Sequence, residues 1–261
     1  MKRYALGIEY DGSGFNGWQA QANDPSVQVC VENAISKIAN HPLRLACAGR
    51  TDTGVHAVCQ VAHFDSQVIR TERQWVLGIN SHLPDTVCVR WVQQVDEEFH
   101  ARFSAIERHY QYRILNRWVR PALRVGLVSW CRRPLDIEIM NTAVGALLGE
   151  HDFSAFRSAG CKANHAVREV TKVSVQRKED EIILNIAANS FLYHMVRNIA
   201  GSLIKIGHGE KPVEWMGKLL AEGDRKQAGM TAPADGLYFM SVRYPDAFRI
   251  PGDLAAFPQV R

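Results

Sequence analysis

The chain has 261 residues, of which 46% are hydrophobic, and a formal net charge of +4 at pH 7. A chain of this length and composition can bury its own core, as one large domain or two closely packed ones, without disulfides. Its six cysteines are scattered singly, which argues against a Cys-x-x-Cys metal or redox motif and favours reduced thiols in the cytoplasm. The small positive charge suggests an anionic partner without establishing one.

The pattern of apolar residues argues against export and against membrane insertion. Acidic residues interrupt the N-terminal segment before any apolar run long enough for a signal peptide. The most apolar helical stretch, residues 191–206, contains His194, Arg197 and Lys205, so it cannot span a bilayer. We therefore expect a soluble, cytoplasmic protein with no membrane partner.

The first half of the chain predicts alternating strands and helices. Apolar residues alternate over residues 4–10, the period of a half-buried strand. A helix is expected after Ser26, although the alternating valines of residues 27–31 also fit a strand. Thr71 and Gln74 form a capping box that opens a second helix. Further strands are expected, in chain order, at residues 43–47, 58–64, 86–95 and 108–115.

The second half partly repeats this order. Asp136 is expected to cap a helix that Gly149 ends. The elements that follow are a hairpin of strands 170–176 and 182–188, helices from Phe191 and from Pro212, and a last strand at residues 237–244. The two α+β halves, residues 1–125 and 126–261, predict a mainly antiparallel sheet with its helices on one face. The other face would then stay free for a partner.

A basic segment lies near the middle of the chain. Residues 108–133 contain seven arginines and no acidic residue, together with Tyr110, Tyr112, Trp118 and Trp130. Guanidinium groups bind phosphates and aromatic rings stack on unpaired bases, so this composition is typical of a nucleic-acid surface. The alternative interpretation is a solvated pair of basic strands.

A charged loop lies between two predicted strands. Residues 49–57 read Gly-Arg-Thr-Asp-Thr-Gly-Val-His-Ala, so two glycines flank Arg50 and Asp52. Glycines allow a tight turn and a close approach to a ligand, and binding residues often lie on such loops. A simple turn, in which Asp52 bonds its own backbone, fits the same residues.

The same nine residues resemble the Gly-Arg-Thr-Asp-x-Gly-Val-His-Ala motif of the tRNA pseudouridine synthase I (TruA) family. Further similar segments follow in the family order and cover nearly the whole chain. They are Tyr-Asp-Gly at 10–12 with Phe-x-Gly-Trp-Gln at 15–19, Ala-Arg-Phe-Ser-Ala at 101–105 with tyrosines at 110 and 112, His-Asp-Phe-Ser-Ala-Phe at 151–156, Phe-x-x-His-Met-Val-Arg at 191–197 and Ala-Pro-x-x-Gly-Leu at 232–237.

The resemblance implies an isomerase that converts uridine to pseudouridine at positions 38, 39 and 40 of the tRNA anticodon stem-loop. Substrate and product are isomers, so no cofactor and no metal are expected. tRNA is the implied partner, and a homodimer the implied assembly. The implied fold is two ferredoxin-like (RRM-like) halves that share a continuous sheet, with a central cleft between them.

The resemblance also assigns roles to five residues. Asp52 matches the essential aspartate and Arg197 the arginine that pairs with it, while Tyr110 matches the tyrosine that stacks on the target base. Arg50 is expected to fill the space of the flipped nucleotide or to hold its phosphate, and Leu237 to line the uracil pocket. Whether Asp52 attacks ribose or base, or abstracts a proton, stays open.

Independent patterns bear on three of these assignments. On a helix whose core face holds Met195 and Ile199, Arg197 points away from the core, as a cleft residue or an ordinary surface arginine does. Tyr110 and Leu237 also fit ordinary core positions of strands.

Two other functions compete with the synthase hypothesis. A metal-dependent hydrolase would use ligands from Asp52, His56, His63 and Asp65, but no further His-rich element follows them. A non-catalytic RNA-binding module with RRM-like halves is the second alternative, although an RNP-type aromatic signature is missing from the sequence.

Overall fold

The computed structural model describes residues 1–21 and 24–251, which form two compact units. The first unit comprises Met1–Arg108 together with residues 239–251, and the second comprises His109–Tyr238. These boundaries differ from the predicted halves 1–125 and 126–261 in two places: the first unit already ends at Arg108, and the end of the last strand groups with the first unit.

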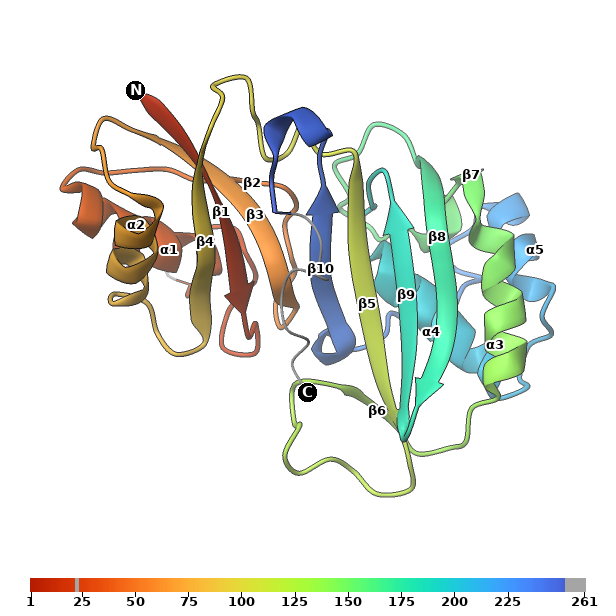
Figure 1. Ribbon diagram of the computed structural model, residues 1–261. Helices are drawn as coiled ribbons and strands as arrows, with labels where there is room; N and C mark the ends of the chain where they lie inside the picture. The colour runs from red at the N-terminus through yellow and green to blue at the C-terminus, as the bar shows by residue number, and fades with distance from the viewer. Residues whose placement is uncertain (22–23, 252–261) are drawn as a thin grey trace. The chain divides into compact units, whose positions relative to one another are not determined.

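The first unit has the βαββαβ order of a ferredoxin-like fold (Figure 1). Its sheet order is β4-β1-β3, and the short strand β2 pairs antiparallel with β3. Figure 1 shows α1 and α2 lying together beside these strands. The elements are β1 (Lys2–Tyr10), α1 (Val27–Ala39), β2 (Ala46–Cys47), β3 (His56–Ser66), α2 (Glu72–Asn80), β4 (Val87–Val95), the part of β10 (Leu237–Arg243) from residue 239 on, and the short 3-10 helix η4 (Asp246–Phe248).

Both helices of the first unit begin where local signals predict. The hydroxyl of Ser26 accepts a hydrogen bond from the backbone N–H of Val29 and caps α1. The capping box of Thr71 and Gln74 is present in both directions at the start of α2. The alternative of a strand over residues 27–31 is therefore wrong.

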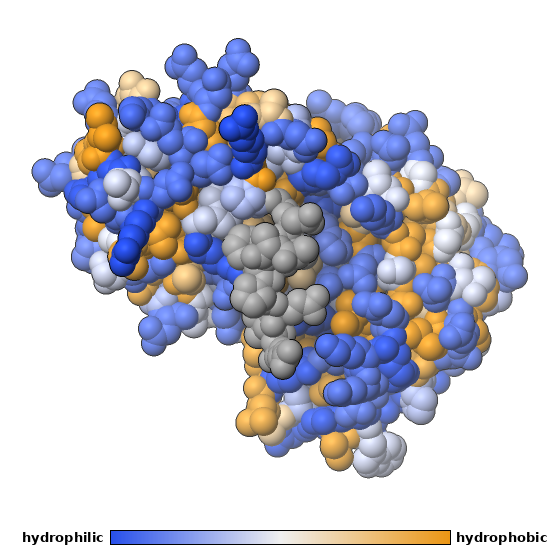
Figure 2. All heavy atoms as spheres, viewed as in Figure 1, coloured by the Kyte–Doolittle hydropathy of each residue, from blue (hydrophilic) through white to orange (hydrophobic). Residues whose placement is uncertain are grey.

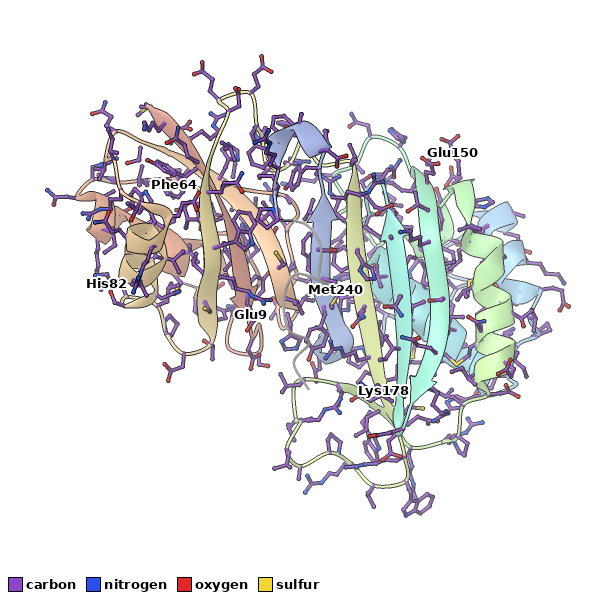
Figure 3. All side chains as sticks on the ribbon, viewed as in Figure 1. Glu9, Phe64, His82, Glu150, Lys178 and Met240 are labelled. Carbon is purple, nitrogen blue, oxygen red and sulfur yellow. The ribbon has the colours of Figure 1, made fainter. Side chains whose placement is uncertain are left out.

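Aromatic residues form the centre of the first unit's core. Phe64 of β3, labelled in Figure 3, stacks on Tyr4 of β1 with ring centroids 5.5 Å apart, and both rings contact Trp75 of α2. β1 is not half-buried as its alternation predicted, because its second face is covered too. Trp91 packs directly on Gly7, where a Cβ atom would lie 2.1 Å from the indole nitrogen.

The second unit carries its sheet in the order β5-β9-β8-β7, with β6 parallel to β5 and the other neighbours for which register is defined antiparallel. Figure 1 shows α3 beside β8, with α5 next to it. The elements are β5 (Glu107–Asn116), β6 (Ser129–Cys131), α3 (Ile137–Val144), η1 (Gly145–Leu147), β7 (Gly149–Asp152), η2 (Ser154–Phe156), β8 (Val167–Lys178), β9 (Glu181–Ala188), α4 (Met195–Gly207), α5 (Trp215–Glu222) and η3 (Ala234–Gly236).

The elements confirm an α+β fold with a mostly antiparallel open sheet, with local differences from the prediction. The predicted hairpin is β8 and β9. The helix predicted from Phe191 starts only at Met195, because His194 adopts a left-handed conformation with φ of 60°. The helix predicted to end at Gly149 ends at Val144, and the short 3-10 helix η1 follows it. Strands β6 and β7 were not predicted, since they are too short to show alternation.

On the face shown in Figure 2, hydrophilic residues are widespread, with hydrophobic residues interspersed among them. Within residues 1–21 and 24–251, every helix is too short or too polar to cross a lipid bilayer.

Candidate active site

The loop that carries Asp52 connects β2 to β3 and is anchored on both sides of the aspartate. Thr51 has only 7% of its surface exposed and Val55 only 1%, whereas Asp52 between them is half-buried. Two buried anchors therefore fix the backbone on either side of the half-buried aspartate. Arg50 lies on the same loop and is exposed.

The turn that follows β1 holds this loop through the backbone. The N–H of Trp18 donates to the carbonyl of Thr51 at 3.0 Å, and the N–H of Gly54 donates to the carbonyl of Phe15 at 3.3 Å. Gly17 lies between these contacts with φ of 89°, and a Cβ atom there would lie 2.7 Å from the Thr51 oxygen. Only glycine combines this conformation with so close an approach.

A buried side-chain hydrogen bond ties the loop to β1 as well. The hydroxyls of Tyr10 and Thr51 are 2.7 Å apart. Burial raises the pKa of the Tyr10 phenol well above its usual value, so this hydroxyl stays neutral and able to donate. The contact joins residues that are 41 positions apart in the sequence, which sequence patterns cannot reveal.

The far end of the loop is held by His56, the first residue of β3. Its Nδ1 atom lies 3.1 Å from the backbone nitrogen of Gly12 and 3.2 Å from a carboxylate oxygen of Asp11. Burial favours the neutral form of Asp11, but hydrogen bonds from Ser13 and the neighbouring His56 outweigh it and lower the pKa of this carboxyl. Asp11 is thus a charged partner for His56.

Two of the four residues proposed as ligands of a hydrolase metal, His63 and Asp65, are engaged elsewhere. Nδ1 of His63 accepts a hydrogen bond from the Ala101 N–H at 3.2 Å. Both carboxylate oxygens of Asp65 accept from the Arg3 guanidinium at 2.8 Å. In the part of the chain that the structure describes, no three His, Cys, Asp or Glu side chains are grouped as a metal site would need.

In the second unit, Arg197 lies in the first turn of α4 and is fixed by a neighbouring segment. Its Nε donates to the carbonyl of Ala232 at 2.8 Å, and the Ala232 N–H donates back to the Arg197 carbonyl at 3.1 Å. Met195 and Ile199 are buried while Arg197 is half-buried, so the helix face predicted for it is confirmed.

Tyr110 on β5 is only 8% exposed and packs edge-on against Phe191, with ring centroids 4.9 Å apart. Leu237 is also buried, at 6% exposed, and begins β10. Both positions show the core packing that was the alternative interpretation, which leaves a role in base recognition as a prediction. Phe191 was expected in a helix, and its contact with Tyr110 was not foreseen.

One segment, residues 230–237, connects the elements that carry these residues within the second unit. Its carbonyl groups accept hydrogen bonds from Arg197 and, at Pro233, from the hydroxyl of Tyr112 at 2.8 Å. Gly236 follows, where a Cβ atom would lie 2.6 Å from the carbonyl of Arg113 on β5. The Ala-Pro-x-x-Gly-Leu motif is thus a structural link between α4 and β5.

Comparison with known proteins places this chain in a family. The sequence profile described as tRNA pseudouridine synthase matches residues 7–104 and 143–245. Curated relatives named tRNA pseudouridine synthase A include those of Xylella fastidiosa M23 (53% identical, covering 98% of this chain and 100% of the relative), Stenotrophomonas maltophilia K279a (54%, 97% and 99%) and Hydrogenovibrio crunogenus (51%, 96% and 96%).

These matches define an isomerase class of enzyme with a mixed α+β fold. The profile and the full-length relatives together show that the chain belongs to the tRNA pseudouridine synthase family. A chain from a solved Cbf5-Nop10-Gar1 complex aligns with 90% of this chain and 57% of its own length, at 12% identity and a TM-score of 0.32.

Proposed function

We propose that this enzyme isomerises uridine at positions 38, 39 and 40 of the tRNA anticodon stem-loop, with Asp52 as the catalytic nucleophile. The observation that supports Asp52 most directly is its place in the loop. It is a half-buried carboxylate between the buried anchors Thr51 and Val55, on a backbone held by the turn after β1. A reacting group needs such a fixed position, because small displacements of reacting atoms cost large factors in rate.

The reaction requires one carboxylate and no electron carrier. The bond between uracil N1 and the ribose C1′ breaks, a new bond forms between C5 and C1′, the C5 proton leaves and N1 gains a proton. Atoms and electrons therefore balance within the substrate and water. Attack of Asp52 on ribose or on the base, or removal of a ribose proton by it, is compatible with this balance.

Four further residues have proposed roles around the target nucleotide. Arg197 is the cation that pairs with Asp52, held in orientation by Ala232. Tyr110 and Leu237 supply the apolar walls for the uracil ring. The exposed Arg50 stabilises the extruded nucleotide by filling its place or binding its phosphate.

Replacement of the aspartate tests the proposal. Asp52→Ala is expected to lower turnover by on the order of 10³-fold or more, as removal of a nucleophile does, while affinity for tRNA survives because it depends on many phosphate contacts. Release of tritium from uridine labelled at C5 measures turnover, and filter binding measures affinity. Asp52→Asn is the matched variant, since it keeps the size and shape of the side chain.

Two results would contradict a catalytic role for Asp52. One is appreciable turnover by both variants. The other is loss of binding and turnover together with loss of folded structure, which would make Asp52 a turn residue. A wild-type chain that binds tRNA but releases no tritium would instead support the alternative of a non-catalytic RNA-binding module.

Substrate position is a separate part of the proposal. Transcripts of tRNA that carry a single uridine at position 38, 39 or 40 should each be converted, whereas a transcript with its only anticodon-arm uridine elsewhere should not. Conversion of the control transcript at a similar rate would remove the assignment to these three positions.

We further propose that the working unit is a cytoplasmic homodimer. A folded tRNA extends beyond what one chain of 29.3 kDa can contact, and a second copy would provide contacts to the body of the tRNA. Sedimentation at working concentration measures this directly. A monomer that keeps full turnover would remove the dimer from the proposal.

A further inference from the structure

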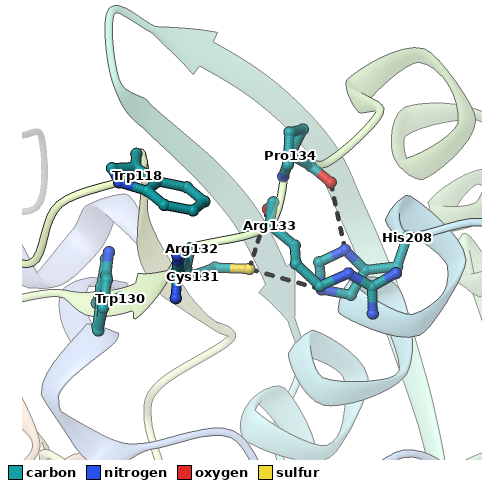
Figure 4. A pocket seen from close by; sticks show the side chains of 7 residues that line it. All are labelled: Trp118, Trp130, Cys131, Arg132, Arg133, Pro134 and His208. Atoms are coloured by element: carbon teal, nitrogen blue, oxygen red, sulfur yellow. Dashed lines mark hydrogen bonds between the residues drawn. The ribbon is translucent and has the colours of Figure 1, made fainter.

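A surface pocket of about 640 Å³ lies in the second unit, and its lining includes none of the residues assigned to the reaction (Figure 4). It is formed by the segment from residue 118 to residue 134 and by the residue that follows α4. The lining residues are Trp118, Trp130, Cys131, Arg132, Arg133, Pro134 and His208, and together they are called the tryptophan–arginine pocket. This segment falls between the two ranges that match the family profile.

Two exposed tryptophans in one pocket are the first sign of a binding site. Trp118 is 70% exposed and Trp130 is 43% exposed. Tryptophan is seldom left this open to water without a partner, and exposed tryptophans are enriched at binding surfaces. The indole N–H of Trp130 donates to the carbonyl of Arg117 at 2.9 Å, so this ring is held in place before any ligand arrives.

The second sign is an arginine stacked on one of these rings. The guanidinium carbon of Arg132 lies 3.5 Å from the centroid of Trp118, and Figure 4 shows the two side chains together in the pocket. This contact occupies one face of the indole, and the large exposure of Trp118 leaves the rest of the ring open. Stacking also orients the planar guanidinium, whose N–H groups stay available at its edge.

Charge indicates what the pocket accepts. Arg133 is paired with Glu210 at 2.7 Å. Arg132 is exposed, and among residues 1–21 and 24–251 no carboxylate lies within ion-pair distance of it. The Arg132 guanidinium, which has no carboxylate partner among the described residues, therefore offers a group for an anion, and the open part of the Trp118 indole offers one for a flat ring.

Two contacts of His208 tie the pocket segment to the end of α4. Nδ1 of His208 lies 3.3 Å from the carbonyl of Pro134, and its Nε2 lies 3.6 Å from the sulfur of Cys131. These contacts, drawn as dashed lines in Figure 4, fix the segment to the end of α4. A pocket that is formed in advance spends less of its binding energy on ordering its own residues.

We propose that the tryptophan–arginine pocket binds one unstacked nucleotide of the RNA substrate, distinct from the uridine that reacts. The base stacks on the open part of Trp118, and the adjoining phosphate receives hydrogen bonds from Arg132. Aromatic rings beside cationic side chains are the general means by which proteins hold single-stranded nucleotides. This inference rests on the proposed function only in taking tRNA as the substrate.

A second copy of this chain fits the pocket less well. Two exposed aliphatic residues of the same segment, Leu123 at 97% and Val125 at 66%, do not line it. A protein partner would bury these residues first, because apolar area drives association. Arg132, which has no acidic partner in the described part of the chain, matches a phosphate better than an apolar protein surface does.

Substitution at Trp118 tests the proposal in the full-length protein. Trp118→Ala is expected to raise the Kd for tRNA and the KM by about 5- to 150-fold, the usual value of one base stacked on an aromatic ring, and to leave kcat unchanged. Trp118→Phe should restore most of the affinity, because it keeps an aromatic face. Leu123→Ala is the control from the same segment and should leave both constants unchanged.

Fluorescence identifies the chemical group that is bound. A short oligouridylate should quench the tryptophan emission of the wild-type protein, whereas inorganic polyphosphate, which has charge but no base, should not. The part of the quenching that is due to Trp118 should be missing in Trp118→Phe. Equal quenching by the two probes would show that the site binds phosphate alone and would overturn base stacking.

Two further results would overturn the proposal. One is an unchanged affinity for tRNA in Trp118→Ala. The other is a parallel loss in Trp118→Ala and Leu123→Ala together with a change in sedimentation, which would make this surface an interface between copies. Failure of the proposed function can be distinguished from failure of this inference. If the wild-type protein shows no turnover, tRNA binding and fluorescence quenching still measure whether the pocket binds a nucleotide.

Discussion

The loop of Asp52 and the tryptophan–arginine pocket are built in opposite ways. The loop has its anchors in the interior: Thr51, Val55 and Trp18 are almost fully buried, and Gly17 leaves no room for a Cβ atom. The pocket keeps its largest side chains in solvent, with Trp118 at 70% exposed. The loop is fixed by the core of the first unit, whereas the pocket is a platform on the surface of the second.

This difference fits the two tasks that we propose for these regions. A group that reacts must be held to within a fraction of an ångström, which requires contacts on all sides. A group that stacks on a base or binds a phosphate tolerates small displacements, because dispersion and charge interactions vary gradually with distance. Substitutions near the loop should therefore affect kcat, and those near the pocket should affect affinity.

The largest effect is expected from a methyl group at Gly17. In Gly17→Ala the Cβ atom would lie 2.7 Å from the Thr51 oxygen on a backbone with φ of 89°, so the Asp52 loop must move. We expect turnover to fall by about 10²-fold or more and the free energy of unfolding by about 2–4 kcal/mol. Gly14→Ala is the matched control in the same turn, since nothing lies within 4 Å of a Cβ atom there. Equal behaviour of the two variants would show that the loop adapts easily.

A smaller effect is expected from removing one hydroxyl behind the loop. Tyr10→Phe leaves the buried hydroxyl of Thr51 without its 2.7 Å partner and should lower the free energy of unfolding by about 1–2 kcal/mol. Turnover should fall by about tenfold at an unchanged Kd for tRNA. Tyr4→Phe in the same strand is the control, because its hydroxyl has only a 3.5 Å contact with Val68. Urea unfolding and single-turnover rates of Tyr10→Phe and Tyr4→Phe measure these effects. If Tyr10→Phe raised the Kd for tRNA and left turnover unchanged, the contrast between the loop and the pocket would be wrong.

Acid should weaken the framework of the first unit through His63 on β3. Burial and nearby cationic groups lower the pKa of this ring to about 4, from an ordinary value near 6.5. The unfolded chain therefore binds a proton at higher pH than the folded one, and stability is lost as the pH falls from about 6.5 towards 4. We expect protonation of this ring to lower the free energy of unfolding by about 1–2 kcal/mol. This is less than the energy equivalent of the full pKa difference, because solvent partly screens the ring.

The pH effect is checked by the slope of unfolding free energy against pH. His63→Gln should flatten this slope between pH 6.5 and 4, even if it lowers the stability at neutral pH by removing a buried ring. An unchanged slope would assign the acid sensitivity to other groups.

The smallest effects are expected in the basic segment, where the structure sharpens the hypothesis from sequence. Arg113 stacks on Tyr238 at 4.2 Å and Arg117 pairs with Asp180 at 3.5 Å, so both are partly engaged within the protein. Arg120 and Arg132 are exposed and have no carboxylate partner among the described residues. The double variant of Arg120 and Arg132 to Ala should reduce the dependence of log Kd on log salt by about two.

The control for the salt experiment is the double variant of Arg113 and Arg117 to Ala, which should change the slope less. Both double variants should weaken binding to all tRNAs to the same extent, because phosphate contacts carry little sequence information. If neither slope changes, the segment is a solvated basic surface, as the alternative interpretation held.

Local signals in the sequence identified most elements of the fold. The capping box at Thr71, the cap at Ser26 and the hairpin of β8 and β9 were all predicted, because each depends on residues within a few positions of one another. The start of α4 was misplaced, since nothing in the apolar pattern of residues 191–206 indicates the left-handed conformation of His194. Strands β6 and β7 were missed because they exist through pairing with β5 and β8.

For the candidate site, the sequence by itself determined the family and supplied the residues that we propose, through the nine-residue motif of Asp52 and the segments that accompany it. Only the tertiary structure decided how they are held: Tyr10 against Thr51, Gly17 against the same carbonyl, and Ala232 against Arg197. It also decided that Trp118 and Arg132 stack in a pocket with His208, a residue 76 positions beyond Arg132 in the sequence. The reason is physical: spacing along the chain encodes periodicity and capping, whereas contacts between distant residues arise only when the packed elements bring them together.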